Sequence, residues 1–433
     1  MPFEADVAIV GAGAAGLAAA RLLARHRLRC VLLEGATMIG GRLRTLRRPG
    51  WQMPIELGAE FVHGRPAPTL ALGGGAVELV HVPEQRVRVD AEVQPMPDTW
   101  PRFAAALGGA LNAPVDQSIA EYLQGANLQP EQSELVRLIV QGYHAAPLDD
   151  VAARPIAEDA ARSATDFEQF RTARGYDQVL ASLEHGLPAD AVRLQLGRRV
   201  TRIAWCPGAV TLETTGTAGP AQLSSKCCLV TASLGVLQAR PVDGGIVFEP
   251  EPPTFRRTLP LLGMGSVVRV VLRFAPGPAL PVVAGVETSF VHVPGAPFDT
   301  LWREARAGQA QITAWSGGPA ARELLRLGPS RWVDAALESL ARAVGSSVSD
   351  CRSALIEAHY HDFENDPLTR GAYSYVRPGG ESARQTLAEP WEKTVFWAGE
   401  ALDLQHPSTV AGALGSGEHA AREIVAALSA QRP

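Results

Sequence analysis

The hydrophobic pattern at the start of the chain changes its period twice. An apolar, β-branched run at residues 6–10 ends at a glycine and predicts a short buried strand. Residues 17–23 are rich in alanine and leucine and predict a helix, and the apolar run at 30–33 predicts a second strand. The order strand, glycine turn, helix, strand indicates a βαβ unit.

The pattern along the rest of the chain is less regular. At residues 77–175 proline, glycine and alanine become more frequent and helical patterns follow, so we expect an inserted, mostly helical region. Further elements are predicted as follows: helices at 116–123, 131–143 and from 175, a hairpin at 192–204 and 209–214, buried strands at 227–231 and 267–274, a helix at 331–344 and an amphipathic helix ending near 428.

Composition narrows the possible functions. With 433 residues, 46% of them hydrophobic, the chain can bury two or three domains' worth of core. A net charge of −5 argues against a general nucleic-acid binder. No signal peptide is recognisable and no apolar run approaches the length of a membrane span. We therefore expect a soluble, cytoplasmic protein without membrane association.

The five cysteines form no CxxC pair and no metal-ligand spacing, so no metal site is predicted. Cys227 and Cys228 are adjacent in a predicted strand, and their side chains should therefore point to opposite faces. We expect free, buried thiols in a reducing compartment.

The turn after the first strand carries three glycines at GxGxxG spacing. Gly11 permits the tight turn, Gly13 lets a pyrophosphate approach the backbone, and Gly16 lets the helix pack against the strand. The helix start offers free N–H groups to phosphates, and Glu34 can accept hydrogen bonds from a ribose hydroxyl. The combination predicts dinucleotide binding, and an ordinary βα turn is the alternative.

Two nearby stretches carry further candidates. In Gly40-Gly41-Arg42 the guanidinium can contact a phosphate, although a surface turn is an equal alternative. Gly58 and Ala59 are small residues in an apolar setting, suited to a backbone that lies against a flat ring. Directly after them come Glu60 and His63. An interior histidine with satisfied hydrogen bonds is the more common case for His63.

The C-terminal segment contains a second helix start rich in small residues. The apolar run at 395–397 leads into Ala398-Gly399-Glu400, and Ser408-Thr409-Val410 then opens a Gly/Ala/Ser-rich helix. A bulky anionic or flat cofactor can approach the backbone at such a point.

With these residues in view, the chain resembles the flavin-containing amine oxidase superfamily, which includes monoamine oxidases, polyamine oxidases and lysine-specific histone demethylases. The resemblance covers nearly the whole chain. It rests on separate motifs in a fixed order: Gly11 to Gly16 with Glu34, Gly40-Gly41-Arg42, residues 57–59, 231–237, 263–274 and 370–375, Ala398 to Glu400, and Ser408 to Val410.

The resemblance implies an α/β fold: a Rossmann-type FAD-binding domain with an interleaved α+β substrate domain. The FAD-binding domain would comprise 1–76, 176–260 and 365–433, and the substrate domain 77–175 and 261–364. By resemblance, Glu34 would hold the adenosine ribose, Arg42 the pyrophosphate and the Val200 backbone the adenine. Glu400 would lie at the ribityl–pyrophosphate region. The implied cofactor-binding set is Gly11, Gly13, Ala14, Ala15, Gly16, Glu34, Gly41, Arg42, Gly58, Ala59, Val200, Gly399, Glu400, Thr409 and Val410.

Three departures from the family pattern are informative. Ala372 stands where monoamine oxidases attach FAD through cysteine, so the resemblance implies non-covalent FAD. Tyr373 matches one of the two tyrosines that flank the amine in monoamine oxidases, whereas Thr409 replaces the other, as in polyamine oxidases and demethylases. Arg269 stands where most members carry a lysine that reaches flavin N5 through a water. A guanidinium cannot serve as a base near neutral pH.

The implied function is amine oxidation, with polyamine-like substrates slightly favoured. Hydride would pass from the carbon next to a neutral amine to flavin N5, the imine would hydrolyse, and O₂ would reoxidise the flavin to give H₂O₂. The candidate catalytic residues are Arg269, Tyr373, His63 and Glu60. Two alternatives remain: a flavin-dependent desaturase or dehydrogenase acting on a non-amine substrate, and a flavin-binding interaction protein without turnover.

Overall fold

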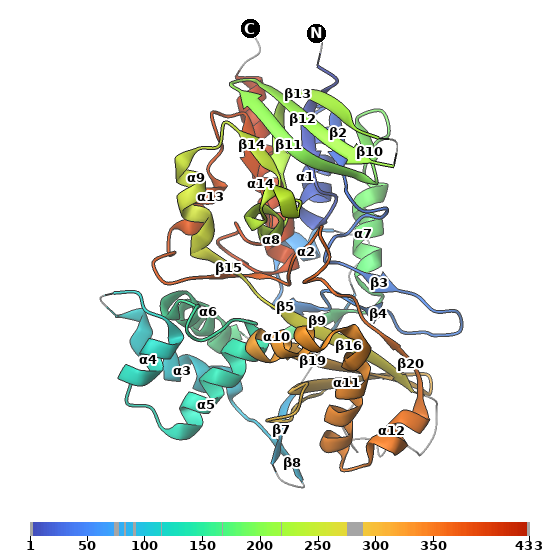
Figure 1. Cartoon of the computed structure of the whole chain (residues 1–433), viewed down its shortest axis with the longest axis vertical. Helices are drawn as coiled ribbons and strands as arrows, with labels where there is room; N and C mark the ends of the chain where they lie inside the picture. The colour runs from blue at the N-terminus through green and yellow to red at the C-terminus, as the bar shows by residue number, and fades with distance from the viewer. Residues whose placement is uncertain are drawn as a thin grey trace.

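The computed structural model describes residues 3–72, 78–81, 84–89, 92–113, 115–166, 168–217, 219–274 and 289–430. Within these residues the molecule has two halves along its long axis, and both termini lie at the same end (Figure 1). One half is built around a mixed sheet with helices on both faces. The other half combines a second sheet with a group of helices beside it.

The first sheet carries the predicted βαβ unit at its centre. β1 runs parallel to both β2 and β13. All residues of β1 and β2 are buried, as is typical of parallel strands covered on both faces. The strand order is β10 (Val192–Gln195), β2 (Cys30–Leu33), β1 (Ala5–Val10), β13 (Ala221–Val230), β12 (Ala209–Gly216), β11 (Arg198–Cys206) and β14 (Val247–Glu249), and β22 (Val395–Trp397) also pairs with β13.

Helices from opposite ends of the chain cover one face of this sheet. α1 (Ala14–Arg25) and α14 (Val410–Ser429) lie side by side, and α7 (Tyr176–His185) packs next to them (Figure 1). α9 (Pro253–Thr258) and α13 (Ala383–Ala388) cover the other face. Cys227 belongs to the first core and Cys228 to the second, which confirms that the two thiols point to opposite faces.

The second half has its own sheet and core. The strand order is β20 (Leu355–His359), β16 (Val267–Phe274), β19 (Gln309–Gly317), β18 (Thr300–Arg306), β17 (Ser289–His292), β7 (Glu84–Val89) and β8 (Glu92–Pro95). α10 (Gly318–Leu327), α11 (Pro329–Val344) and α12 (Val348–Ala354) pack against it. The adjoining helices are α3 (Thr99–Leu111), α4 (Ile119–Gly125), α5 (Pro130–Leu138) and α6 (Ala153–Asp166).

Short elements lie between the two halves. Small sheets join β5 (Phe61–His63) and β6 (Leu79–His81) to β9 (Gln169–Thr172), β3 (Thr45–Leu46) to β4 (Ile55–Glu56), and β15 (Leu262–Met264) to β21 (Ser374–Val376). The remaining helical turns are α2 (Ala67–Leu70), α8 (Leu234–Gln238), Pro241–Asp243 and Leu259–Leu261.

The structure corrects two of the predicted elements. Region 77–175 is not mainly helical at its start, because β6, β7 and β8 precede the helices. β6 and β7 pair with β9 and β17, which lie far away in the sequence, so local periodicity did not show them. β8 joins the same sheet through β7. The predicted strand at 192–204 is two strands. Gly197, with a φ of +65°, turns the chain so that β10 and β11 join different parts of the sheet. The predicted β11–β12 hairpin is confirmed.

The strands distribute between the two sheets in a simple way. Every strand of the first sheet comes from 1–76, 176–260 or 365–433, and every strand of the second comes from 77–175 or 261–364. Two small sheets, β5-β9-β6 and β15-β21, join the two sets of segments. We propose this division as the domain organisation.

Helix α5 ends at Leu138 and continues as a π-helical turn over Ile139–Tyr143, a geometry that is frequent at functional sites.

Candidate active site

A cavity of about 1080 Å³ runs from the first βαβ unit to the second sheet. This volume is at the upper end of the range for small-molecule sites, about 300–1,000 Å³. Every predicted site residue lines it except Gly16. A Cβ on Gly16 would lie 1.9 Å from the Gly11 carbonyl oxygen, so Gly16 acts through helix–strand packing, as its position in the motif predicted.

The glycine turn forms one end of the cavity. Gly11 has a φ of +104°, a conformation that favours glycine. Gly13 precedes α1 and provides no side-chain cap, so the first-turn N–H groups stay available to an anion. A Cβ on Gly13 would meet only the Gly40 carbonyl oxygen, at 3.7 Å. This end of the cavity is therefore shaped for close approach of a phosphate.

Glu34 closes the same end and is held rigidly. Its Oε2 accepts a hydrogen bond from the Ala12 N–H at 2.8 Å, and its Oε1 accepts one from the Ala36 N–H at 2.8 Å. Burial raises the pKa of Glu34, against the opposing effect of these hydrogen bonds. Each carboxylate oxygen keeps acceptor capacity for a further donor such as a ribose hydroxyl. Val200, on β11, lines the cavity beside it.

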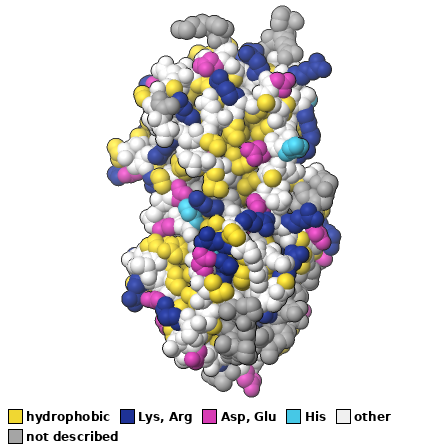
Figure 2. Space-filling view, turned by 90° about the vertical axis from the view of Figure 1, so that its right-hand side faces the viewer, with side chains coloured by type: hydrophobic (Ala, Val, Ile, Leu, Met, Phe, Trp, Pro, Cys, Tyr) yellow, Lys and Arg dark blue, Asp and Glu magenta, His cyan; other side chains and the backbone are white. Residues whose placement is uncertain are grey.

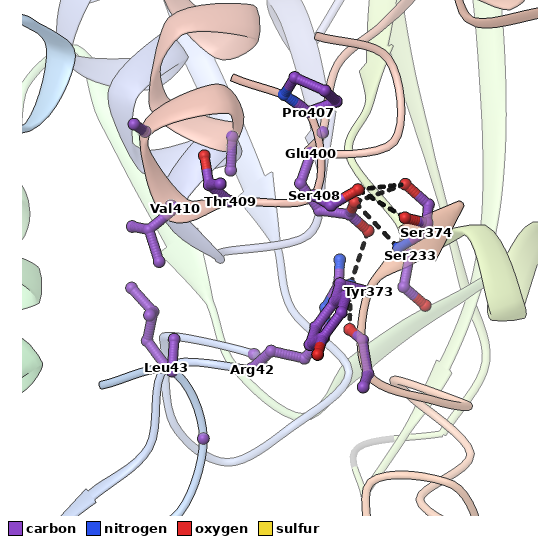
Figure 3. Close-up of a pocket in the computed structure, with 18 of the residues that line it drawn as sticks. Arg42, Leu43, Ser233, Tyr373, Ser374, Glu400, Pro407, Ser408, Thr409 and Val410 are labelled. Atoms are coloured by element: carbon purple, nitrogen blue, oxygen red, sulfur yellow. Dashed lines mark hydrogen bonds and ion pairs between the residues drawn. The ribbon is translucent and has the colours of Figure 1, made fainter. Parts of the chain in front are cut away.

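Arg42 joins segments that are far apart in the sequence. Its Nη1 donates to Glu400 Oε1 at 2.7 Å and also to the Ala372 carbonyl. Glu400 Oε2 accepts from the Ser374 hydroxyl at 2.7 Å (Figure 3). Burial alone would raise the pKa of Glu400, but Arg42, Arg384 and Ser374 hold it below its usual range. Arg42 is therefore part of the cavity wall, and the surface-turn interpretation is wrong.

The small residues Gly58 and Ala59 have an immediate structural partner. A Cβ on Gly58 would lie 1.9 Å from the Arg42 carbonyl oxygen, and the Ala59 N–H donates to that oxygen at 3.2 Å. Gly58 is therefore required by the backbone at Arg42, in addition to its place on the cavity surface.

Thr409 is the N-cap of α14. Its hydroxyl accepts a hydrogen bond from the Gly412 N–H at 3.0 Å and donates to the His406 carbonyl at 2.7 Å. In Figure 3, Val410 and Leu43 face each other across the cavity. Helix capping thus explains a threonine at this position, because a tyrosine could not cap the helix in the same way.

The second sheet contributes a buried ionic cluster to the cavity wall. Arg269 on β16 pairs with Glu60, and its Nη1 donates to the Gly58 carbonyl at 2.8 Å. Arg171 Nε lies 2.7 Å from Glu60 Oε1, and the Trp302 indole N–H is 3.2 Å from both carboxylate oxygens. The expected role of Glu60 as an ammonium ligand or base therefore needs correction, since arginines and an indole already surround its carboxylate.

Aromatic side chains line the rest of this inner part. We call the set Phe61, Trp100, Tyr143, Phe290, Trp302, Trp315 and Tyr373 the aromatic chamber. The Tyr373 hydroxyl donates to the Tyr143 carbonyl at 2.6 Å, and burial raises the pKa of Tyr373 above its usual value. The His63 and Tyr143 ring centroids are 5.4 Å apart, and burial lowers the pKa of His63 to about 4. His63 is therefore neutral near pH 7.

Sequence reasoning missed several of these residues. Arg171 and Trp302 complete the ionic cluster, Trp100 and Tyr143 form chamber walls, and Ser374 holds Glu400. Each of these residues contacts partners that are remote in the sequence, so no local residue spacing predicts its role. A charged residue inside a four-residue buried strand, as Arg171 is in β9, is the one signal available in the sequence.

The residues at this site fit a dinucleotide with a flat ring system. The donor set offers helix N–H groups for phosphate and an oriented carboxylate for ribose at one end. At the other end, Gly399 adopts a φ of +146° and a Cβ there would meet nothing within 4 Å, which leaves open space at the backbone. These features fit a nucleotide cofactor, and the aromatic chamber begins beyond them.

Comparisons with known proteins agree with this geometry. Residues 14–425 match the model of the family described as flavin containing amine oxidoreductase. A lysine-specific histone demethylase 1 homolog 2 from Oryza sativa subsp. japonica is 28% identical over 97% of this chain and 57% of its own length. Polyamine oxidase 4 from the same plant is 25% identical, over 96% of this chain and 88% of its own length.

Solved structures show the same fold. A putrescine oxidase with bound putrescine has a TM-score of 0.81 at 17% identity, over 98% of this chain and 99% of that one. Cyclohexylamine oxidase from Brevibacterium oxydans IH-35A has a TM-score of 0.80 at 20% identity, with the same coverage. The chain spans 57% and 52% of the length of two demethylase homologues from rice, and 58% and 30% of the length of two from Arabidopsis thaliana. In the described residues, no helix has the length and apolarity to cross a membrane.

The family match covers nearly all of the chain, and the cavity carries the expected residues at both of its ends. The chain belongs to the family of flavin-containing amine oxidoreductases.

Proposed function

We propose that this chain is an FAD-dependent amine oxidase that oxidises a C–N bond and releases H₂O₂. The observation that carries the proposal is the continuity of the cavity, which joins the phosphate- and ribose-shaped end to the aromatic chamber. When bound, the flavin accepts hydride at N5 and passes electrons to O₂. We further propose that FAD is held non-covalently, because Ala372 offers no nucleophile where monoamine oxidases carry a cysteine.

The protein's own part is positioning and desolvation. The first turn of α1 and Glu34 orient the nucleotide, and the Arg42–Glu400 pair fixes the segments that meet over the middle of the cavity. Aromatic walls exclude water and disfavour the ammonium form of the substrate, which favours the neutral amine needed for oxidation. Tyr373, held by the Tyr143 carbonyl, acts as a fixed wall.

Two side chains remain candidates for a role at the substrate. His63 lines the chamber in its neutral form. A pKa of about 4 makes it a poor acceptor of an ammonium proton, so we keep it as a candidate hydrogen-bonding partner of the amine. Arg269 places a permanent positive charge on the cavity surface, although Glu60 offsets it. The preference for polyamine-like substrates rests on Thr409 and the stretch at 57–64 and stays a prediction.

An anaerobic flavin-bleaching screen tests the proposed function. The purified holoprotein is mixed with a panel of amines, a conjugated hydrocarbon and a tetrapyrrole while flavin absorbance is followed. Bleaching by an amine alone is the expected result. Bleaching only by the hydrocarbon or tetrapyrrole would favour the desaturase alternative, and a flavin that none of them reduces would favour the interaction protein.

A further inference from the structure

The aromatic chamber has apolar walls and few groups that can hold a charge. The ring centroids of Phe61, Phe290 and Trp302 lie between 5.3 and 5.4 Å apart, and Trp315 lies 6.0 Å from Trp302. His292 also lines the cavity, and burial lowers its pKa to about 4. With His63 neutral as well, the imidazoles carry no charge near pH 7.

Among the described residues, Glu60 is the buried carboxylate of this inner part, and it is already engaged. Its oxygens are in contact with Arg269, with Arg171 and with the Trp302 indole N–H. Only 7% of its surface is exposed. A carboxylate with charge-assisted contacts on both oxygens has little capacity left to neutralise an incoming ammonium.

The aromatic faces beside Glu60 are also occupied. The Arg269 guanidinium lies 5.4 Å from the centroid of the Trp302 ring, and that of Arg171 lies 5.1 Å from the Phe61 ring. Aromatic rings can attract a cation through their faces, but these two already do so with arginine. A second ammonium at this wall would instead meet like charge.

Carboxylates elsewhere on the cavity do not supply the missing counter-charge. Asp159 on α6 acts electrostatically on His63 and Tyr143 at the chamber. Its side chain is 36% exposed and its Oδ1 lies 3.3 Å from Arg162 Nη2, so an ammonium beside it would stay partly in water. Glu381 pairs with Arg154. Glu158 is exposed, so an ammonium beside it would remain in water. Glu56 and Glu304 lie behind the wall and do not line the cavity, and burial raises the pKa of both.

We propose that the aromatic chamber accepts the uncharged part of an amine with a single ammonium group, and that Glu60, closed by Arg269 and Arg171, excludes a second ammonium from it. This inference rests on the proposed function. It replaces the polyamine preference expected from the sequence with alkyl- or arylalkylamines that carry one amino group. The physical reason is desolvation, because an ammonium that is buried without a partner loses its hydration and gains nothing in return.

The test compares two amines of equal length, hexylamine and 1,6-diaminohexane, on the holoprotein. Flavin reduction is followed anaerobically, and the shift in melting temperature caused by each amine measures binding without turnover. We expect hexylamine to half-saturate the protein at a concentration at least about tenfold lower than 1,6-diaminohexane does. Hexylamine should also cause the larger shift in melting temperature. Equal or tighter binding of the diamine would overturn the inference. If neither amine is oxidised, the proposed function fails. The shifts in melting temperature then still show whether the chamber binds the amine with one ammonium group more tightly than the diamine.

A variant supplies a gain-of-function test. Arg171→Met frees one side of Glu60 without altering a residue that lines the cavity. We expect the preference for hexylamine over the diamine to fall at least about threefold. Arg273→Met is the matched control, because Arg273 lies on the same strand as Arg269 and pairs with Glu357 away from the cavity. An unchanged preference in folded Arg171→Met, or an equal change in Arg273→Met, would count against the inference.

Discussion

At the scale of single residues, the site depends on charges that are buried together. Glu60 lies between Arg269 and Arg171, and Glu400 lies between Arg42 and Ser374. Each group would be costly to bury alone, so every member depends on its partners. The charged groups in the cavity wall are therefore already paired with one another.

Replacing Glu60 tests this dependence. Glu60→Gln removes the charge of the one carboxylate that contacts both buried guanidiniums, and we expect a loss of about 3–5 kcal/mol in the free energy of unfolding. Urea denaturation of the apoprotein measures it. Glu357→Gln is the control, because Glu357 also contacts two arginines, Arg48 and Arg273, but its side chain is 36% exposed. A loss of about 1 kcal/mol or less is expected there. Similar losses in both variants would show that burial of the cluster formed by Glu60, Arg269 and Arg171 does not make its charges more important for stability.

Glu56 predicts a pH dependence of stability. Burial raises its pKa to about 7 from an ordinary 4.5, despite hydrogen bonds from Thr45 and Tyr176. Between these values the folded protein binds more protons than the unfolded chain, so this contribution to stability falls as pH rises through the window. Relative to Glu56→Gln, we expect the wild type to lose up to about 3 kcal/mol between about pH 5 and pH 8. Urea denaturation across this range checks it, and a difference that grows in favour of the wild type would refute it.

At the scale of elements, two helices from opposite ends of the chain hold the nucleotide end together. α1 and α14 pack so closely that a Cβ on Gly417 would lie 2.2 Å from the Ala15 carbonyl oxygen. Thr409 fixes where α14 begins, next to the same cavity. The helix that carries the C-terminal motif therefore also positions the helix that follows the glycine turn.

A matched pair of glycine variants tests this contact. Gly417→Ala should push α14 away from α1, lower stability by about 1–3 kcal/mol and weaken FAD binding. Gly415→Ala lies on the same helix with ordinary contacts of 3.4 Å. We expect it to be neutral or to stabilise by up to about 1 kcal/mol, since alanine is the better helix former. Thermal unfolding and FAD titration measure both. Equal FAD affinity in the two variants would show that the close contact between α1 and α14 is not needed for FAD binding.

At the scale of the whole molecule, the cavity lies where the two halves meet. Arg42 and Glu400 are separated by 358 positions, and Arg269 and Gly58 by 211. Figure 2 shows side chains of both charge signs interspersed over one face, without a broad field of a single sign.

The mode of cofactor attachment can be read on the whole protein. If FAD is non-covalent, acid precipitation should leave all the flavin in the supernatant, because Ala372 cannot form a thioether. Chromatography and absorbance of the supernatant should then identify FAD. Flavin that stays with the precipitated protein would refute non-covalent binding, and release of FMN would refute the choice of cofactor.

Much of the fold could be predicted because its signals are local. The strand, glycine turn and helix at residues 5–25 follow from periodicity and from the conformational freedom of Gly11. β6 and β7 could not be predicted in this way, because they are stabilised by their distant partners β9 and β17.

The sequence by itself determined the family, the cofactor end of the cavity and the absence of a cysteine at Ala372, since these depend on residue types at fixed spacing. Only the tertiary structure decided what Glu60 and Arg269 do. Their pairing, and the closure of the pair by Arg171 and Trp302, arises from strands that are remote in sequence. A buried charge takes its role from its neighbours in space, and sequence spacing carries no record of those neighbours.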